Sequence, residues 1–236
     1  MVGLLHRHGP ALRPGLAALL LLTATAGCEG ALSTVDPAGP AARTIATLWW
    51  VMLAGAAAIF ALVMVLLALP FLRRGKDAPE ARGIKVWIIG LGLAFPMAVL
   101  AALLAYGLTV GERLLPRAED GAIRVEAEGR QSGWTFRYAD QPGRSTSGVL
   151  HIPAGRPVDV DITTGDVIHS FWVPRLAGKL DAIPGYVNTL RIEADAPGDY
   201  AGVSAEFSGI GYAGLTFTVT AHDEAGWQAF LGDDPQ

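Results

Sequence analysis

Two long segments without a charged residue most constrain what this chain can fold into. The first runs over residues 47–72 and the second over residues 86–110. Each exceeds the roughly 20 apolar residues that an α-helix needs to cross the hydrocarbon core of a bilayer. The pattern predicts a two-helix transmembrane hairpin over residues 47–110.

The segment between these helices sets the orientation of the hairpin. Residues 73–85 carry five basic and two acidic residues. Short cytoplasmic loops of membrane proteins carry an excess of lysine and arginine. The loop is therefore expected on the cytoplasmic side, and both ends of the hairpin on the outer side of a bacterial cytoplasmic membrane.

The N-terminal residues resemble a bacterial export signal. Arginines precede an apolar run and a stretch of small residues, "TATAG", which ends at Cys28. We interpret residues 1–27 as a lipoprotein signal peptide, Cys28 as the lipidated residue and residues 28–46 as a linker. The alternative is an ordinary signal peptide followed by an unrelated cysteine.

After residue 117 the pattern changes to short alternating segments separated by Gly, Pro, Asp and Asn. Val158, Val160 and Ile162 illustrate the alternation, which is typical of half-buried strands. Eight strands in a domain of residues 117–236 predict a β sandwich or barrel. A short helix with Asp223 as its N-cap is expected to follow. The expected strands cover residues 122–128, 134–138, 148–153, 157–163, 167–174, 188–194, 198–205 and 214–220.

Composition excludes several kinds of site. Cys28 is the one cysteine, so the chain forms no internal disulfide and its β domain contains no thiolate. From residue 117 onward there are 17 acidic and 9 basic residues, a net charge of −8, without a basic and aromatic cluster for nucleic acid. The sequence "GIGYAG" at residues 209–214 is followed by a strand rather than a helix, which argues against dinucleotide binding.

Three stretches in order along the chain indicate a family. They are "VEAEGRQSGWTFRY", "DVIHSFWVPRLAGKLDAIPG" and "SAEFSGIGYAGL", and all follow the hairpin. From residue 47 to residue 231 the chain resembles subunit II of the haem-copper terminal oxidases. The resemblance implies a membrane α-helical hairpin followed by an all-β, cupredoxin-like Greek-key sandwich.

The resemblance also assigns positions to a metal centre. In cytochrome c oxidases of this family, subunit II holds the dinuclear copper-A centre through His … Cys-x-Glu-x-Cys-x-x-x-His-x-x-Met. Of the side-chain ligands this sequence keeps only the first histidine. Serine is a poor ligand for a soft copper ion, so no copper-A centre is expected. The corresponding positions here are His169, Ser204, Glu206, Ser208, Tyr212 and Leu215.

Three of these positions also have a structural interpretation. His169 is expected to pack as a neutral imidazole, hydrogen-bonded near Ser204, Ser208 or Tyr212. Tyr212 is expected to fill the volume left by ligand and metal. By resemblance, Glu206 reaches toward a magnesium ion at the interface with subunit I. The alternative for Glu206 is a solvated or hydrogen-bonded acid.

Two further positions depart from the cytochrome c branch. The tryptophan implicated in accepting electrons from cytochrome c falls at Ser132, while Trp134 keeps a second tryptophan. Relatives often have a glutamate, associated with proton entry, just before the tryptophan that opens the second helix. Lys85 occupies roughly that place here.

The resemblance thus implies a subunit II without copper, in a quinol-type oxidase that reduces oxygen to water with proton translocation. Haem and copper are expected in subunit I, quinol is oxidised there, and subunit III is a further partner. Two alternatives stay open. One is an electron-transfer subunit for cytochrome c, which the acidic domain favours. The other is a free-standing, membrane-anchored binding module.

Overall fold

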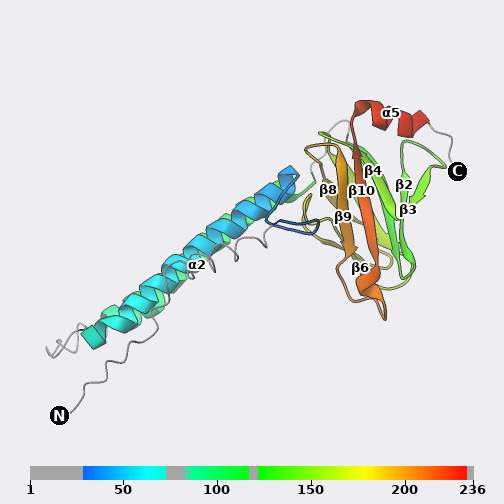
Figure 1. The fold of residues 1–236 in the computed structure, drawn as a ribbon. Coiled ribbons are helices and arrows are strands. Elements are labelled where there is room, and N and C mark those ends of the chain that lie inside the picture. The colour runs from blue at the N-terminus through cyan, green and yellow to red at the C-terminus, as the bar shows by residue number, and fades with distance from the viewer. Residues whose placement is uncertain (1–28, 73–82, 84, 117–121, 233–236) are drawn as a thin grey trace, which may run out of the picture.

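The computed structural model describes residues 29–72, 83, 85–116 and 122–232 and consists of a helical hairpin joined to a β sandwich (Figure 1). The expected signal peptide, Cys28 and most of the basic loop lie outside the described residues.

The hairpin is formed by α2 (Pro40–Leu72), the π-helix η1 (Lys85–Ala94) and α4 (Phe95–Leu114). Both helical arms are long and apolar enough to cross a membrane. The helix type changes from π to α next to Pro96, which lies in the first turn of α4. Proline lacks an N–H and its ring clashes with the carbonyl four residues earlier, so regular α-helical bonding does not continue through it.

Helix α2 begins seven residues before the expected start at Thr47, inside the stretch predicted as a linker. Proline is favoured in the first turn of a helix, and alanines follow it. Contacts with the sandwich hold this end: the Ala42 N–H donates to the Leu176 carbonyl at 3.1 Å, and Arg43 pairs with Asp195. Gly39 lies against the Glu193 carbonyl, where a Cβ atom would clash. Tertiary contacts therefore extend the helix.

The sandwich contains two five-stranded sheets, which confirms the expected fold class. One sheet has the order β3-β2-β1-β5-β8 and the other β4-β10-β9-β6-β7. Pairing is parallel for β1 with β5 and for β4 with β10, and antiparallel elsewhere. The strands are β1 (Ile123–Arg130), β2 (Gly133–Tyr138), β3 (Ser145–Ser147), β4 (Val149–Pro153), β5 (Val158–Thr164), β6 (His169–Trp172), β7 (Leu180–Ala182), β8 (Asn188–Ile192), β9 (Gly198–Ser204) and β10 (Thr216–His222).

All eight expected strands are present, together with β3 and β7, which the sequence did not predict. Each of these has three residues and lies at the edge of its sheet. Three residues are too few for alternation to be recognised, and pairing with a longer neighbour supplies their hydrogen bonds.

An aromatic cluster fills the space between the sheets. Trp134 and Phe136 of β2 pack against Phe171 of β6 and Phe217 of β10, with ring centroids 5.5–6.5 Å apart, and Phe171 stacks on Phe217 at 4.7 Å. Phe217 lies directly over Gly202, where any side chain would collide with its ring. Burying these rings supplies much of the free energy that holds the two sheets together.

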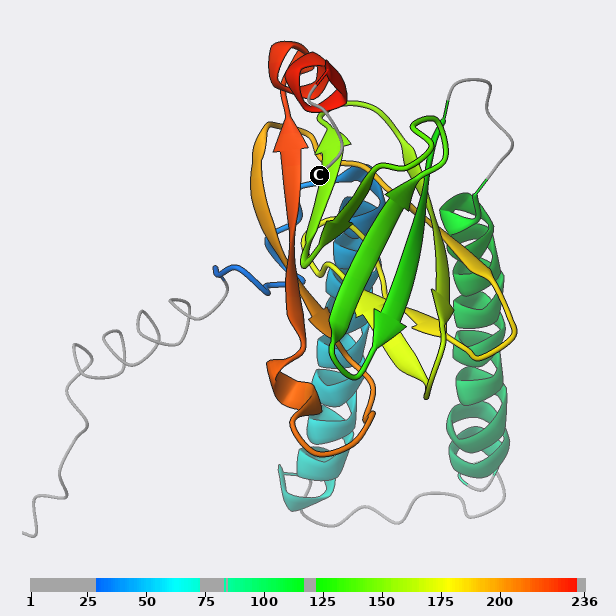
Figure 2. The same cartoon turned by 90° about the vertical axis from the view of Figure 1, so that its right-hand side faces the viewer.

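Helix α5 (Glu224–Gly232) closes one end of the sandwich. The Gly226 N–H donates to the Asp223 carboxylate at 2.7 Å, which confirms the expected N-cap. The loops after β1, β5, β7 and β9 lie at the opposite end, near the label β6 in Figure 1. In Figures 1 and 2 this end points toward the side to which the hairpin extends. We call it the ligand-loop end.

Candidate functional site

The ligand-loop end brings together several of the positions that correspond to copper ligands. His169 begins β6, and Ser204 ends the neighbouring strand β9. Backbone pairing between these strands is continued by the Ala205 N–H, which donates to the Ser170 carbonyl at 3.0 Å. The side chains of His169, Ser204 and Ser208 are buried.

His169 is held by an aspartate rather than by the residues expected from the sequence. Its Nε2 lies 2.8 Å from Oδ1 of Asp166. An ionised carboxylate only accepts, so Nε2 carries the proton and donates. The expectation that His169 bonds near Ser204, Ser208 or Tyr212 was wrong. The turn after β5 places Asp166 closer to the ring.

Asp166 is the hub of this end of the domain. Besides the histidine it accepts from the N–H groups of Gln131 at 2.8 Å and Val167 at 2.6 Å, and from the Thr164 hydroxyl at 2.9 Å. Burial acts to raise the pKa of Asp166, but these donors together hold that pKa well below its ordinary value. No motif in the sequence indicated a role for this residue. Its one local signal is the turn "TTGD" before β6.

Three buried polar atoms at the positions that correspond to copper ligands have no hydrogen-bond partner among the described residues: His169 Nδ1, Ser204 Oγ and Ser208 Oγ. One ring nitrogen and two hydroxyls suit hydrogen bonding. They do not suit a dinuclear copper centre, whose bridging needs thiolates that a serine hydroxyl cannot replace. The donor set therefore does not fit copper-A.

The outer ligand positions lie at the surface. Tyr212 is half-buried in the 3-10 turn η2 (Tyr212–Gly214), and its ring packs edge-on against exposed Phe207 at 5.2 Å. That Tyr212 fills the volume left by ligand and metal stays a prediction. Leu215 is half-buried, and its carbonyl accepts from the Ser204 N–H at 2.8 Å.

Glu206 points partly into solvent. Its carboxylate lies 3.8 Å from the Lys179 ammonium, and both side chains are about half exposed. Among the described residues no three His, Cys, Asp or Glu side chains form a group that could hold a metal ion. Glu206 is thus an accessible carboxylate that belongs to no such group in the described part of the chain.

The remaining predicted positions differ in burial. Trp134 is buried in the aromatic core, 6.3 Å from the His169 ring, whereas Ser132 is exposed at the turn between β1 and β2. Lys85 is exposed at the start of η1.

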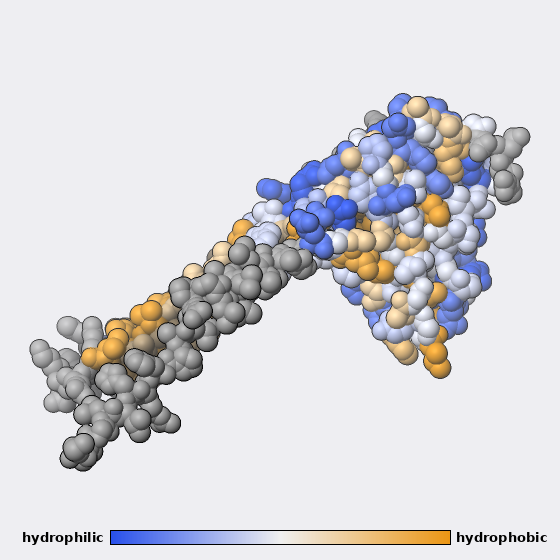
Figure 3. Space-filling view, viewed as in Figure 1, coloured by the Kyte–Doolittle hydropathy of each residue, from blue (hydrophilic) through white to orange (hydrophobic). Residues whose placement is uncertain are grey.

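Exposed apolar side chains surround the ligand-loop end, and we call this group the apolar rim. They come from the loops after β5, β7 and β9, and hydrophobic atoms are visible at the lower tip of the domain in Figure 3. Apolar groups that are exposed together on one face indicate an interaction surface. The apolar rim consists of Val167, Ile168, Ile183, Tyr186, Val187, Phe207 and Ile210.

The known proteins similar to this chain are named as subunits 2 of cytochrome c oxidases and of quinol oxidases. Residues 141–222 match the family "Cytochrome C oxidase subunit II, periplasmic domain". A ubiquinol oxidase subunit 2 from Acetobacter aceti is 31% identical over 226 residues, which cover 88% of this chain and 69% of that protein. A cytochrome c oxidase subunit 2 from Alkalihalophilus pseudofirmus is 29% identical over 222 residues, covering 90% of this chain and 64% of the relative.

A solved structure is also similar. The periplasmic domain of subunit II of cytochrome oxidase from Bradyrhizobium japonicum is 23% identical, with a TM-score of 0.46 over 49% of this chain and 93% of that one. The matched region spans 64% of the Alkalihalophilus relative and 30% of a cytochrome c oxidase subunit 2 from Synechocystis. The extent and identity of the Acetobacter match show that the chain belongs to the subunit II family of the haem-copper oxidases.

Proposed function

We propose that this chain is the subunit II of a quinol-type terminal oxidase and that it supports subunit I without a redox centre of its own. In this proposal subunit I contains the haems and copper, oxidises quinol, reduces oxygen to water and translocates protons. The chain itself is a membrane protein with an outward-facing β domain.

The observation that carries the proposal is the chemistry of the former copper-A positions. Ser204 and Ser208 replace both thiolates, and the Nε2–H of His169 donates to Asp166. An electron arriving at this domain from cytochrome c has no acceptor at these positions. A quinol dissolved in the membrane needs no such relay, because it reaches subunit I directly.

The apolar rim supports a structural role beside subunit I. It surrounds the ligand-loop end, which points toward the side of the hairpin (Figures 1 and 2). The apolar outer surface of the hairpin offers a second area for a membrane partner or lipid. We place subunit I against the rim, with Glu206 available as a ligand for a magnesium ion shared with that subunit, and subunit III as a further neighbour.

One observation favours cytochrome c as the donor instead. The residues from 117 onward carry a net charge of −8, and an acidic surface attracts a basic protein. Attraction alone transfers no electron, so this alternative requires a different acceptor in the complex.

The proposal is tested by purifying the complex from its membrane through a tag on this chain. Haem should copurify, and oxygen uptake should be rapid with a soluble quinol and absent with reduced cytochrome c. Uptake with cytochrome c alone would support the electron-transfer alternative. Purification of the chain without haem would favour a free-standing binding module.

A further inference from the structure

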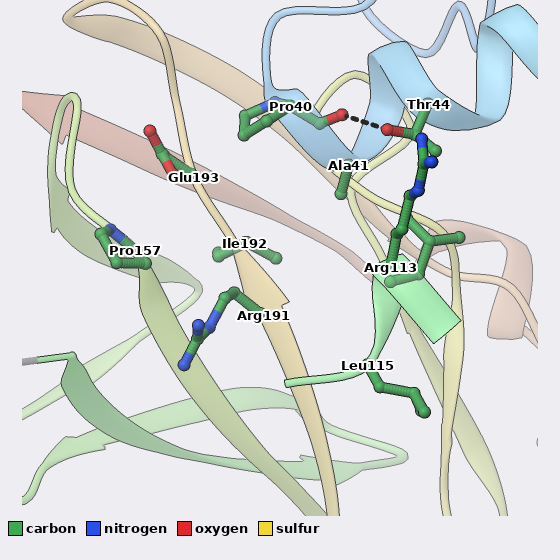
Figure 4. A pocket seen from close by; sticks show the side chains of 10 residues that line it. Pro40, Ala41, Thr44, Arg113, Leu115, Pro157, Arg191, Ile192 and Glu193 are labelled. Carbon is green, nitrogen blue, oxygen red and sulfur yellow. Dashed lines mark hydrogen bonds between the residues drawn. The ribbon is translucent and has the colours of Figure 1, made fainter. Parts of the chain in front are cut away.

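Two adjoining pockets lie where α2 begins, α4 ends and β8 leaves the sheet. One has a volume of about 390 Å³ and the other about 310 Å³. Pro40, Thr44 and Arg113 line both of them, so the two form one groove, and Figure 4 shows the lining of the first pocket. We call it the interfacial pocket.

The pocket lies at the depth of lipid headgroups on the outer side of the membrane. Trp49 and Trp50 follow Thr44 on α2 by about one to two helical turns. Tryptophans of this kind mark the boundary between hydrocarbon and water. The apolar lengths of α2 and α4 continue from here into the membrane, so acyl chains can lie along them below the pocket.

Two side chains of opposite charge line this pocket without forming an ion pair. Neither Arg113 nor Glu193 forms an ion pair within 4 Å among the described residues, although Glu193 also lies within electrostatic range of Arg43. In Figure 4 they come from opposite sides of the pocket, Arg113 from the end of α4 and Glu193 from the segment after β8. The other arginines are engaged, Arg191 by Asp159 at 2.8 and 3.0 Å and Arg43 by Asp195.

The threonines of the pocket offer few hydrogen-bond donors. Thr44, Thr47 and Thr109 each donate their hydroxyl to a helix carbonyl, at 3.0, 2.8 and 2.8 Å. An anion in the pocket would therefore be bound by the guanidinium of Arg113. That planar group matches two oxygens of a phosphate.

We propose that the interfacial pocket binds one phospholipid whose headgroup carries a primary ammonium, as in phosphatidylethanolamine. The phosphate binds Arg113 and the ammonium binds Glu193. A free anion would be repelled by Glu193, whereas a zwitterion spans the two charges on the facing walls. A choline headgroup is a poorer fit, because its quaternary nitrogen has no N–H to donate to the carboxylate.

The test uses the full chain, purified in detergent, stripped of lipid and examined by native mass spectrometry with added lipids of identical acyl chains. We expect one molecule of phosphatidylethanolamine to remain bound under conditions that remove phosphatidylglycerol and phosphatidylcholine. Arg113→Gln should reduce this binding by about tenfold or more, because it removes a charge-assisted contact. Arg113→Lys should restore part of it.

Two further variants assign the headgroup. Glu193→Gln should abolish the preference for ethanolamine over glycerol headgroups. One lipid should still bind to this variant, because Arg113 still binds the phosphate. Arg137→Gln is the matched control and should bind lipid as the unchanged chain does. Arg137 is an exposed arginine on β2, and β2 lies on the side of the sandwich away from the hairpin in Figure 1.

Three results would overturn the proposal. The first is equal binding of all three lipids, and the second is equal loss in the Arg113→Gln and Arg137→Gln variants. The third is displacement of the lipid by glycerophosphoethanolamine at an equal concentration. That displacement would assign the pocket to a soluble phosphate ester instead of a lipid.

Discussion

Replacing Asp166 with alanine tests whether this carboxylate holds the ligand-loop end together. The change removes four hydrogen bonds at once, from the N–H groups of Gln131 and Val167, the Thr164 hydroxyl and the His169 ring. The losses are unequal, because the His169 side chain is fully buried whereas the two backbone bonds lie near solvent.

The buried donor dominates the expected cost. Leaving the Nε2–H of His169 without a partner costs about 1–3 kcal/mol. The Thr164 hydroxyl can donate its one proton to the Val167 carbonyl instead, at 2.9 Å, and the two backbone groups can bond to water. Together these losses predict a decrease of about 2–4 kcal/mol in the free energy of unfolding of the β domain.

Urea unfolding of the fragment from residue 122 onward, followed by tryptophan fluorescence, measures the change. Asp140→Ala is the control, because Asp140 is exposed in a turn, and its effect should stay within about 0.5 kcal/mol. A decrease below about 1 kcal/mol for Asp166→Ala would refute the hub role.

The pH dependence gives a second criterion for the same variant. The pKa of Asp166 is lowered in the folded domain, since its donors outweigh the opposing effect of burial. The stabilisation is therefore fully present above the unfolded pKa of about 3.9 and is lost as the pH falls through the lower folded value. The difference between the unchanged domain and Asp166→Ala should shrink in acid. A difference independent of pH would contradict the assignment.

Three other predictions follow from the same contacts. Copper added to the β domain should produce no thiolate-to-copper absorption band, and a stoichiometric purple or blue colour would contradict the donor chemistry of the former ligand positions. Glu206→Ala should lower the magnesium or manganese bound per purified complex yet change the domain's unfolding free energy by less than about 0.5 kcal/mol, since its side chain is 42% exposed. A ring nitrogen of His151 lies 2.8 Å from one of His222, and the His151 ring stacks on Phe230 of α5. The pKa of His151 is lowered, mainly by burial and then by the charge of His222, while the charge of Asp199 acts to raise it. Acidification below about pH 6.5 should therefore destabilise the domain, and His151→Gln should flatten that dependence in urea titrations at several pH values.

The sequence by itself determined the features that depend on local pattern and on residue chemistry. Uncharged runs long enough to cross a bilayer predicted the hairpin, and alternation predicted eight strands, because both signals repeat along the chain. The sequence also determined that the positions corresponding to the copper ligands contain no thiolate, since the identity of these residues does not depend on how the domain folds.

Other features were decided only by the tertiary structure, because they depend on groups that are distant in the chain. Strands β3 and β7 exist through pairing with a longer neighbour, and α2 begins at Pro40 because its first turn contacts the sandwich. Asp166 is the partner of His169 because the fold brings donors from two loops to one carboxylate. Arg113 and Glu193 line one pocket only because α4 ends beside the exit of β8, a juxtaposition of residues 80 positions apart that no local pattern records.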